Sequence, residues 1–359
     1  MQRIRLPNPP RRVLIVKPSA IGDVVHGLPV LALLKRHWPA ASFSWLVTPA
    51  CAGILDGHPM LDEVIRFDRK GLGTSWHTPA GVRALVDVGR SLAGRRFDLV
   101  IDLQGLFRSG WLTAQTLAPV RVGLSDAREM ATLFYTHRAQ VGRRERHAVE
   151  RYLAVPEALG AGRGPVEFPF ATSAADRAFV AAHAPPRYAA LFPGTNWPTK
   201  RWPVERFAAL VEPLSRRFGL ASVVGGGPAE AELAAQIPGA LNLAGKTTLN
   251  QLVALIERAE LVVSNDSGPM HIAAALGKPL VAPFGPTNPV RTGPYGRMPS
   301  VVKLELPCSP CYSRRCSHRT CLQALGVESV LGVVEREMGE ARETDVPFHI
   351  LSPGGAAAS

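Results

Sequence analysis

The sequence predicts an α/β protein with two doubly wound domains, each a parallel sheet with helices on both faces, that face each other across a cleft. The chain has 359 residues, which corresponds to about two domains at roughly 150 residues each. Its 46% hydrophobic and 19% charged residues exclude a disordered or fibrous chain. Short apolar runs precede Gly-containing turns and apolar helical patterns, the alternation typical of parallel sheets.

The first domain is expected over residues 1–165. Its first strand ends in a polar turn at 17–23, and an apolar helical pattern follows at 24–36. Its predicted strands are 13–16 (VLIV), 42–47 (SFSWLV) and 97–103 (FDLVIDL).

The second domain is expected over residues 188–345, where the same plan restarts. Between the domains, residues 166–187 contain prolines and few strand signals, which predicts a linker. Residues 346–359 are expected to form a flexible tail. The predicted strands of the second domain are 188–192, 221–224, 261–264 and 280–284. Because ligands bind at the carboxyl ends of strands in open α/β sheets, the polar residues after these strands are the candidates for a site.

The charge is basic and unevenly divided. The formal net charge is +12: residues 1–180 hold 24 Lys and Arg against 15 Asp and Glu (+9), and residues 181–359 hold 17 against 14 (+3). This surplus indicates either an anionic partner or an Arg-rich, solvated surface. No apolar run approaches the length of a membrane-spanning helix or a secretory signal, so a cytoplasmic protein is expected.

The turn after the first predicted strand contains a carboxylate at the start of a helix. Gly22 permits a close approach of the turn to a ligand, and Asp23 follows it directly. An Asp in this position either caps the helix or, aimed into the cleft, acts as a general base. The residues alone leave both roles open.

Two polar loops of the second domain are candidates for binding a diphosphate. Residues 264–271 (SNDSGPMH) link a strand to a helix, whose N-terminal amides suit an anion. There His271 is either a donor to the ligand or a buried core histidine. In the loop after residues 188–192, Lys200 offers a positive charge.

Two further motifs are less specific. Residues 225–227 (GGG) suggest a nucleotide-binding turn, after which Glu230 or Glu232 would accept from ribose hydroxyls, and there is no P-loop motif. The four late cysteines suggest either structural zinc or a loop of free or disulfide-forming thiols. They are Cys308, Cys311, Cys316 and Cys321.

Together, these residues resemble glycosyltransferase family 9, the ADP-heptose:lipopolysaccharide heptosyltransferases. The resemblance runs from near residue 11 to near residue 325. It is carried by 17–31 (KPSAIGDVVHGLPVL), 102–109 (DLQGLFRS), 147–152 (HAVERY), 193–203 (PGTNWPTKRWP) and 264–289 (SNDSGPMHIAAALGKPLVAPFGPTNP). It implies two Rossmann-like domains in the GT-B arrangement, and inverting, metal-independent transfer of a heptose from ADP-heptose with no cofactor.

The resemblance also implies a role for each matching position. Asp23 becomes the catalytic base. The family often has Thr or Ser where Asn196 stands and Thr where Ser267 stands, and Glu230 matches less cleanly. The implied donor-binding residues are Thr195, Asn196, Lys200, Glu230, Asp266, Ser267, Gly268 and His271. The implied acceptor-binding residues are Lys17, Ser19, Gln104 and Arg108, and no residue is assigned to a metal.

Several alternatives remain. Residues 17–29 and 147–152 resemble enzymes that add the first heptose to Kdo, whereas 307–321 resembles second-heptose enzymes, so the acceptor is Kdo-lipid A or heptosyl-Kdo-lipid A. Another nucleotide-sugar enzyme on this fold, such as an epimerase, is the main rival. A nucleic-acid binder is disfavoured because basic clusters are short and aromatics are 7%. The basic excess is instead interpreted as peripheral contact with the anionic inner membrane surface.

Overall fold

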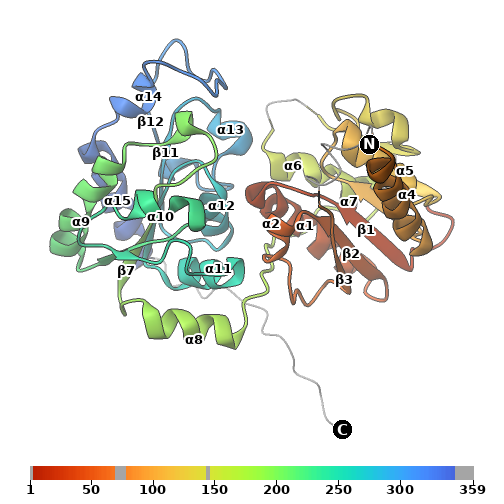
Figure 1. The fold of residues 1–359 in the computed structure, drawn as a ribbon, viewed down its shortest axis with the longest axis horizontal. Coiled ribbons are helices and arrows are strands. Elements are labelled where there is room, and N and C mark those ends of the chain that lie inside the picture. Colours follow the sequence, from red (N-terminus) through yellow and green to blue (C-terminus); the bar gives the residue numbers. More distant parts are fainter. Residues whose placement is uncertain (1–2, 69–77, 143–145, 344–359) are drawn as a thin grey trace, which may run out of the picture. The chain divides into compact units, whose positions relative to one another are not determined.

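The structure is a computed structural model that describes residues 3–68, 78–142 and 146–343. It divides into two compact units, the first ending at Ala171 and the second beginning at Thr172 (Figure 1). This boundary falls inside the range 166–187, predicted as a linker. Nearly half of that range is helix α8 (Ala174–His183), whose N-cap Ser173 accepts a hydrogen bond from the Asp176 amide. The predicted tail, 346–359, lies outside the described residues.

The first unit contains a parallel sheet of six strands in the order β3-β2-β1-β4-β5-β6. The three predicted strands of this domain are present as β1, β2 and β4. The other three lie towards the edges of the sheet and were not predicted. The strands are β1 (Arg12–Val16), β2 (Ser42–Val47), β3 (Glu63–Arg66), β4 (Leu99–Asp102), β5 (Val120–Leu124) and β6 (His137–Ala139).

Helices connect these strands because apolar residues recur with helical spacing between them. Helix α1, which follows the first strand, buries most of its length. The helices are α1 (Ile21–His37), α2 (Pro49–Ala52), α4 (Pro79–Gly94), α5 (Phe107–Gln115), η1 (Ala131–Phe134), α6 (Ala148–Tyr152) and α7 (Ala154–Ala158). One core cluster packs Leu14 and Val16 of β1 against Val100 of β4 and Leu112 of α5.

The second unit has the same strand order. Its parallel six-stranded sheet runs β12-β11-β10-β7-β8-β9. The four predicted strands are present, and the short edge strands β9 and β12 were not predicted. The strands are β7 (Tyr188–Phe192), β8 (Ala221–Val224), β9 (Leu241–Asn242), β10 (Leu261–Ser264), β11 (Leu280–Phe284) and β12 (Val301–Lys303).

The helices of the second unit pack apolar side chains against its sheet. The fully buried Trp202 and Phe207 belong to one core with Leu191 of β7 and Val263 of β10. The helices are η2 (Pro198–Lys200), α9 (Val204–Phe218), η3 (Pro228–Glu230), α10 (Ala231–Ala234), α11 (Leu249–Arg258), α12 (Gly268–Ala275), α13 (Pro289–Thr292), η4 (Met298–Ser300), α14 (Thr320–Gln323) and α15 (Val327–Glu343).

The strand orders confirm the predicted doubly wound class for both units. In each sheet the chain winds outward from a central strand, returns, and winds outward on the other side, as in Rossmann-like folds. The order reverses between β1 and β4 in the first unit and between β7 and β10 in the second. Such switch points are where ligands bind. Within the described residues no helix is long and apolar enough to cross a membrane.

Candidate active site

The loop after β1 is fixed in place by its neighbour β2. The Trp45 indole N–H donates to the Lys17 carbonyl oxygen at 3.2 Å, and the Thr48 amide donates to the Pro18 carbonyl at 2.9 Å. The loop therefore leaves the sheet beside the β1–β4 switch point in a defined direction. It leads into α1, of which Asp23 is the third residue.

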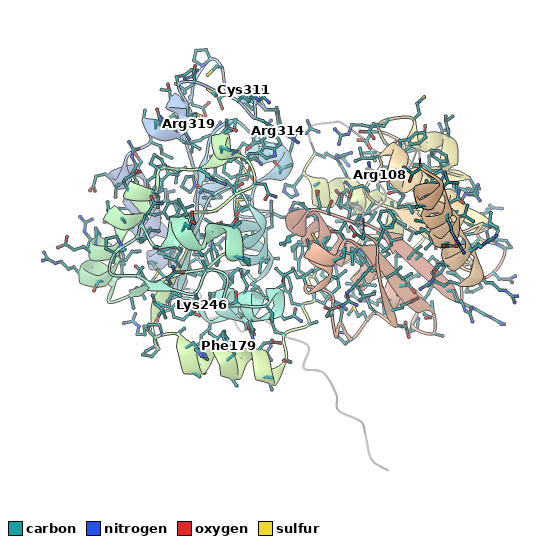
Figure 2. All side chains as sticks on the ribbon, viewed as in Figure 1. Arg108, Phe179, Lys246, Cys311, Arg314 and Arg319 are labelled. Atoms are coloured by element: carbon teal, nitrogen blue, oxygen red, sulfur yellow. The ribbon has the colours of Figure 1, made fainter. Side chains whose placement is uncertain are left out.

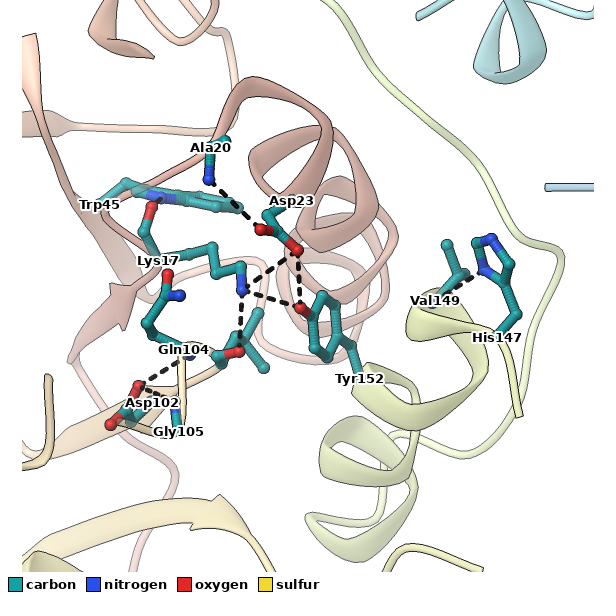
Figure 3. A network of polar contacts seen from close by, with 11 residues as sticks. Lys17, Ala20, Asp23, Trp45, Asp102, Gln104, Gly105, His147, Val149 and Tyr152 are labelled. Atoms are coloured by element: carbon teal, nitrogen blue, oxygen red, sulfur yellow. Dashed lines mark hydrogen bonds and ion pairs between the residues drawn. The ribbon is translucent and has the colours of Figure 1, made fainter. Parts of the chain in front are cut away.

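Asp23 uses its two carboxylate oxygens differently (Figure 3). Oδ2 accepts a hydrogen bond from the Ala20 amide at 3.3 Å, which caps the helix N-terminus. Oδ1 accepts from the Tyr152 hydroxyl at 3.3 Å and lies 3.5 Å from the Lys17 ammonium. The side chain nevertheless remains 41% exposed. The carboxylate is held from inside the protein and open to solvent on its outer side.

Lys17 is the cation behind this carboxylate. Its side chain is 2% exposed, and its Nζ donates to Tyr152 Oη at 2.8 Å and to the Leu103 carbonyl at 3.3 Å. Burial by itself lowers the pKa of Lys17, but Asp23 and Tyr152 raise that pKa above its ordinary value of 10.5. The ammonium therefore stays charged and directs its charge at Asp23.

Tyr152 completes the cluster, and the sequence analysis did not single it out. It lies at the end of α6, fully buried, 129 residues from Asp23 in the chain. Burial raises the pKa of Tyr152 while Lys17 opposes the shift, so the phenol stays protonated and donates to Asp23. The only signal in the sequence was the segment HAVERY, in which Tyr152 is the last residue.

Gln104 follows β4, the strand next to β1 across the switch point. The buried Asp102 shapes its turn by accepting from the Gln104 amide at 2.8 Å and the Gly105 amide at 3.1 Å. Burial raises the pKa of Asp102, although these bonds and those from Ser109 and Tyr135 act against the shift. The Gln104 side-chain oxygen is itself buried and has no hydrogen-bond partner among the described residues.

The other predicted acceptor residues differ in position. Ser19 is half-buried in the loop between β1 and α1. Arg108, labelled in Figure 2, is exposed in the first turn of α5, and no hydrogen bond or ion pair between described residues joins it to the Asp23 cluster. Lys17, by contrast, faces inward onto Asp23. Of the predicted first-unit residues, the structure therefore brings Lys17 and Asp23 into direct contact.

In the second unit, the charged centre is the ion pair between Lys200 and Asp266. Lys200 Nζ lies 2.7 Å from Asp266 Oδ2, and the Lys200 side chain keeps 16% of its surface exposed. The Thr287 hydroxyl donates to the same carboxylate oxygen at 2.6 Å. Asp266 is thus buried and doubly bound, whereas the ammonium retains access to a ligand. Thr287 was missed as a site residue, although it belongs to segment 264–289.

Two loops that follow adjacent strands β7 and β10 are joined by side chains. Asn265 donates through Nδ2 to the Pro193 carbonyl at 2.7 Å and accepts from the Trp202 amide at 3.0 Å. The buried Thr195 donates to the Asp266 carbonyl at 3.4 Å. Together with the Lys200–Asp266 ion pair, these bonds bring Thr195, Lys200 and Asp266 together, while the adjacent Asn196 is exposed.

Helix α12 begins directly after this pair. Ser267 is its N-cap residue, but its hydroxyl makes no capping hydrogen bond and lies 3.3 Å from that of Ser264. The amide of Gly268 therefore starts the helix without a side-chain cap, where an anion is favoured by the helix dipole. His271 lies one turn further on and is buried.

Glu230 reaches the same region from the turn after β8. Its carboxylate accepts from the Gly227 amide at 2.6 Å. A Cβ added at Gly194 would lie only 2.2 Å from Glu230 Cγ, so the two residues touch. The structure thus places Glu230 against the Thr195 loop, whereas Glu232 is exposed in α10.

The four late cysteines are free thiols, two exposed and two partly buried. Burial raises the pKa of Cys321, and the thiols of Cys311, Cys316 and Cys308 raise it further. Over the ranges that the structure describes, no group of three or more His, Cys, Asp or Glu side chains is arranged to hold a metal ion.

The two units, each taken by itself, offer complementary chemistry. The first presents a solvent-accessible carboxylate with a buried ammonium behind it, which suits proton abstraction from a hydroxyl. The second presents a lysine, a hydroxyl-rich loop and an uncapped helix start, which suit a diphosphate. An enzyme that activates a hydroxyl and releases a nucleoside diphosphate needs both.

Comparisons with known proteins agree with this chemistry. The family Glycosyltransferase family 9 (heptosyltransferase) matches residues 85–321. The Lipopolysaccharide heptosyltransferase 1 of Pseudomonas aeruginosa is 34% identical over 86% of this chain and 88% of its own.

Solved structures of heptosyltransferases have the same fold as this chain. E. coli heptosyltransferase WaaC with ADP-2-deoxy-2-fluoro heptose superposes with a TM-score of 0.73 at 27% identity, over 90% of this chain and 99% of that one. E. coli ADP-heptose lps heptosyltransferase II gives 0.73 at 25% identity, over 92% and 99%. The predicted Rossmann-like glycosyltransferase fold is confirmed. This chain belongs to glycosyltransferase family 9.

Proposed function

We propose that this protein transfers a heptose from ADP-heptose to the Kdo/heptose inner core of lipopolysaccharide. The observation that carries the proposal is Asp23: a half-exposed carboxylate at a switch point, held by Lys17 and Tyr152 in a member of the heptosyltransferase family. Relatives named for this activity support the substrates.

The donor is assigned to the second unit. Lys200 and the start of α12 at Gly268 would meet the diphosphate, with hydroxyls from Thr195 and Ser267. Lys200 now pairs with Asp266, so an incoming phosphate would compete for the ammonium. Glu230 is assigned to the ribose hydroxyls, and His271 and Asn196 to further donor contacts.

Asp23 is assigned the role of general base. As the acceptor oxygen bonds to the anomeric carbon, its proton passes to the exposed side of the Asp23 carboxylate. The bond from that carbon to the ADP oxygen breaks at the same time, and its electron pair leaves with ADP. Attack from the face opposite ADP inverts the anomeric centre. The transition state is expected to be oxocarbenium-like, by analogy with glycoside hydrolysis.

The charge that develops on ADP is stabilised by the protein in this mechanism. In this proposal Lys200 and the α12 amides donate to the leaving phosphate. The reaction is therefore proposed to proceed without a metal, and transfer measured in excess chelator should match transfer without it.

The acceptor is assigned to the first unit, through Gln104, Ser19 and Arg108. The unpartnered buried oxygen of Gln104 supports this, since a buried acceptor atom without a partner is costly unless a ligand supplies one. Lys17 acts on the acceptor through Asp23, as a positioning residue. We favour Kdo-lipid A, the first-heptose acceptor, over heptosyl-Kdo-lipid A.

Peripheral contact with the anionic inner membrane surface, from the cytoplasmic side, completes the proposal. Its support is the +9 charge of residues 1–180 and three exposed apolar side chains at α5 and η1, two helices that pack against each other. They are Phe107, Met130 and Leu133, at 47%, 66% and 72% exposure.

ADP release with and without acceptor tests the function. Release that depends on Kdo-lipid A supports transfer. Release at the same rate without any acceptor would favour the rival class, a hydrolase or epimerase acting on the nucleotide sugar.

A further inference from the structure

An arginine-lined cavity lies beside the Lys200 loop and has no role in the proposed reaction. Its volume is about 570 Å³. Figure 2 marks Arg314 and Arg319 in this part of the second unit, near Cys311. The lining residues are Pro198, Thr199, Arg314, Arg315, Cys316, Ser317 and Arg319. Three arginines and two hydroxyl-bearing residues thus line the cavity, and none of the lining residues carries a carboxylate.

The positive charge of this cavity is not balanced locally. Of the described carboxylates, none lies within 4.0 Å of the Arg314, Arg315 or Arg319 guanidinium groups, whereas many other arginines form ion pairs. Arg187, for example, lies 2.8 Å from Glu260. Like charges brought together repel unless an anion or solvent screens them. The cluster therefore favours an anionic ligand.

The cavity is built onto the donor loop through defined contacts. The buried Thr199 donates its hydroxyl to the Ser313 carbonyl at 2.8 Å. Arg314 lies over the Trp197 ring, 4.5 Å from its centroid, and Lys200 Nζ lies 4.7 Å from the same centroid. Trp197 therefore makes cation–π contacts both with Lys200 of the donor loop and with Arg314 of the cavity. The contact with Arg314 restricts the movement of that side chain.

We infer that this cavity is a second anion site, which binds a phosphate ester or pyrophosphate separately from the donor diphosphate. Guanidinium forks bind phosphate oxygens in pairs, which suits three arginines around one cavity. The two sites differ in their residues, because Lys200 is not among those that line the cavity. The phosphate comes either from a phosphorylated acceptor, which rests on the proposed function, or from free phosphate or pyrophosphate.

Titration calorimetry with inorganic pyrophosphate and with ADP tests the site on the full chain. We expect two pyrophosphates to bind the unaltered protein and one to bind the Arg314→Gln/Arg315→Gln/Arg319→Gln variant, or the second to weaken at least about tenfold, the size of one lost charge-assisted hydrogen bond. ADP should bind both proteins equally. A triple Arg→Lys variant, which keeps the charge without the fork, should bind with intermediate affinity.

A matched control separates the site from overall charge. Arg5→Gln/Arg216→Gln/Arg336→Gln removes three positive charges elsewhere and should still bind two pyrophosphates. A single pyrophosphate on the unaltered protein, unchanged binding by the cavity variant, or an equal loss in the control would each overturn the proposal.

Transfer kinetics then identify the source of the phosphate. If the acceptor supplies it, the cavity variant raises KM for phosphorylated acceptor and leaves KM for phosphatase-treated acceptor unchanged. If free anion is the ligand, both KM values stay unchanged while pyrophosphate binding is lost. Because the calorimetry needs no turnover, a failure to transfer heptose would overturn the proposed function and leave this site standing.

Discussion

Asp23 shows how one side chain can serve the fold and the chemistry at once. Its Oδ2 atom caps α1 at Ala20, the role that an Asp at a helix start usually has. Its Oδ1 atom faces Lys17 and Tyr152. The residue pattern left cap and base as alternatives, and the structure places the cap on one oxygen only. Because the side chain is 41% exposed, the carboxylate also presents a side to solvent for the proposed proton transfer.

Asp23→Asn should therefore abolish transfer with little effect on donor binding. The amide keeps an oxygen for the Ala20 amide but cannot accept the proton, so kcat should fall about 100-fold or more. Initial rates and calorimetry with ADP-heptose measure the two effects. Asp56→Asn, which removes a surface partner of Arg66 in the same unit, is the control and should retain activity. Near-normal transfer by Asp23→Asn would remove it as the base.

Tyr152→Phe tests whether the buried phenol positions Asp23. The variant loses the hydrogen bonds to Lys17 and Asp23, so kcat should fall about tenfold, and the free energy of unfolding should fall by about 1–3 kcal/mol. The pKa of Lys17 is raised in the folded protein, so protonated Lys17 stabilises the folded state. This stabilisation is complete below pH 10.5 and is lost as pH rises through the pKa of Lys17 in the folded protein.

The stability deficit of Tyr152→Phe should accordingly be constant near neutral pH and narrow above about pH 10.5, as urea unfolding at several pH values would measure. A deficit that is the same at high pH would show that the phenol acts through packing alone. Tyr312→Phe, at an exposed tyrosine, is the matched control.

At the scale of elements, the sequence predicted the strands that carry the sites but not the sheet edges. The central strands are continuous buried runs, such as Tyr188–Phe192, which periodicity detects. Edge strands are short or poorly buried: Leu241–Asn242 has two residues, and no residue of Glu63–Arg66 is fully buried. Helix α8 was not predicted, because the prolines on either side of it indicated a linker and the helix-capping Ser173 was not taken into account.

The turn after β7 depends on a glycine that touches Glu230. Gly194→Ala should lower ADP affinity and stability, because the new Cβ would collide with Glu230 Cγ, 2.2 Å away. Overpacking of this kind costs about 1–3 kcal/mol. Gly332→Ala, in the middle of α15 with nothing within 4 Å of its Cβ, should instead stabilise the protein by up to about 1 kcal/mol. Thermal unfolding and calorimetry compare the two, and equal effects would contradict this account of the turn.

Lys200, the last residue of η2, forms an ion pair with Asp266. Lys200→Ala should weaken ADP binding about tenfold or more, since it removes a charged donor to the diphosphate. Lys303→Ala, which breaks an exposed pair with Glu305, should leave the affinity unchanged. An unaltered dissociation constant for Lys200→Ala would exclude it from the donor site.

At the scale of the molecule, the residues that the sequence missed are those brought in from far along the chain. Tyr152 reaches Asp23 across 129 residues, and Thr287 reaches Asp266 from the next strand's loop. A motif indicates which residues follow a strand, but it does not indicate which distant side chain will face them. The burial of Lys17 could not be predicted from the sequence either, because it depends on contacts with the distant residues Leu103 and Tyr152.

The charge distribution predicts salt-sensitive binding to anionic membranes. Each Lys or Arg near such a surface contributes about 1 kcal/mol, screened over a Debye length of about 8 Å at physiological salt. Sedimentation with anionic vesicles should show binding that falls as salt rises. Leu133→Ser should weaken it, and Leu241→Ser in the second unit should not. If binding did not change with salt, the surplus charge would be better interpreted as an Arg-rich, solvated surface without a membrane role.

The central claim is heptosyl transfer with Asp23 as base, and mass spectrometry of the product tests it most directly. The protein is incubated with ADP-heptose and Kdo-lipid A, beside Asp23→Asn under the same conditions. We predict that the unaltered protein adds one heptose to the acceptor and releases one ADP, and that the variant yields no such product. An acceptor of unchanged mass while ADP accumulates, or equal product from the variant, would contradict the account.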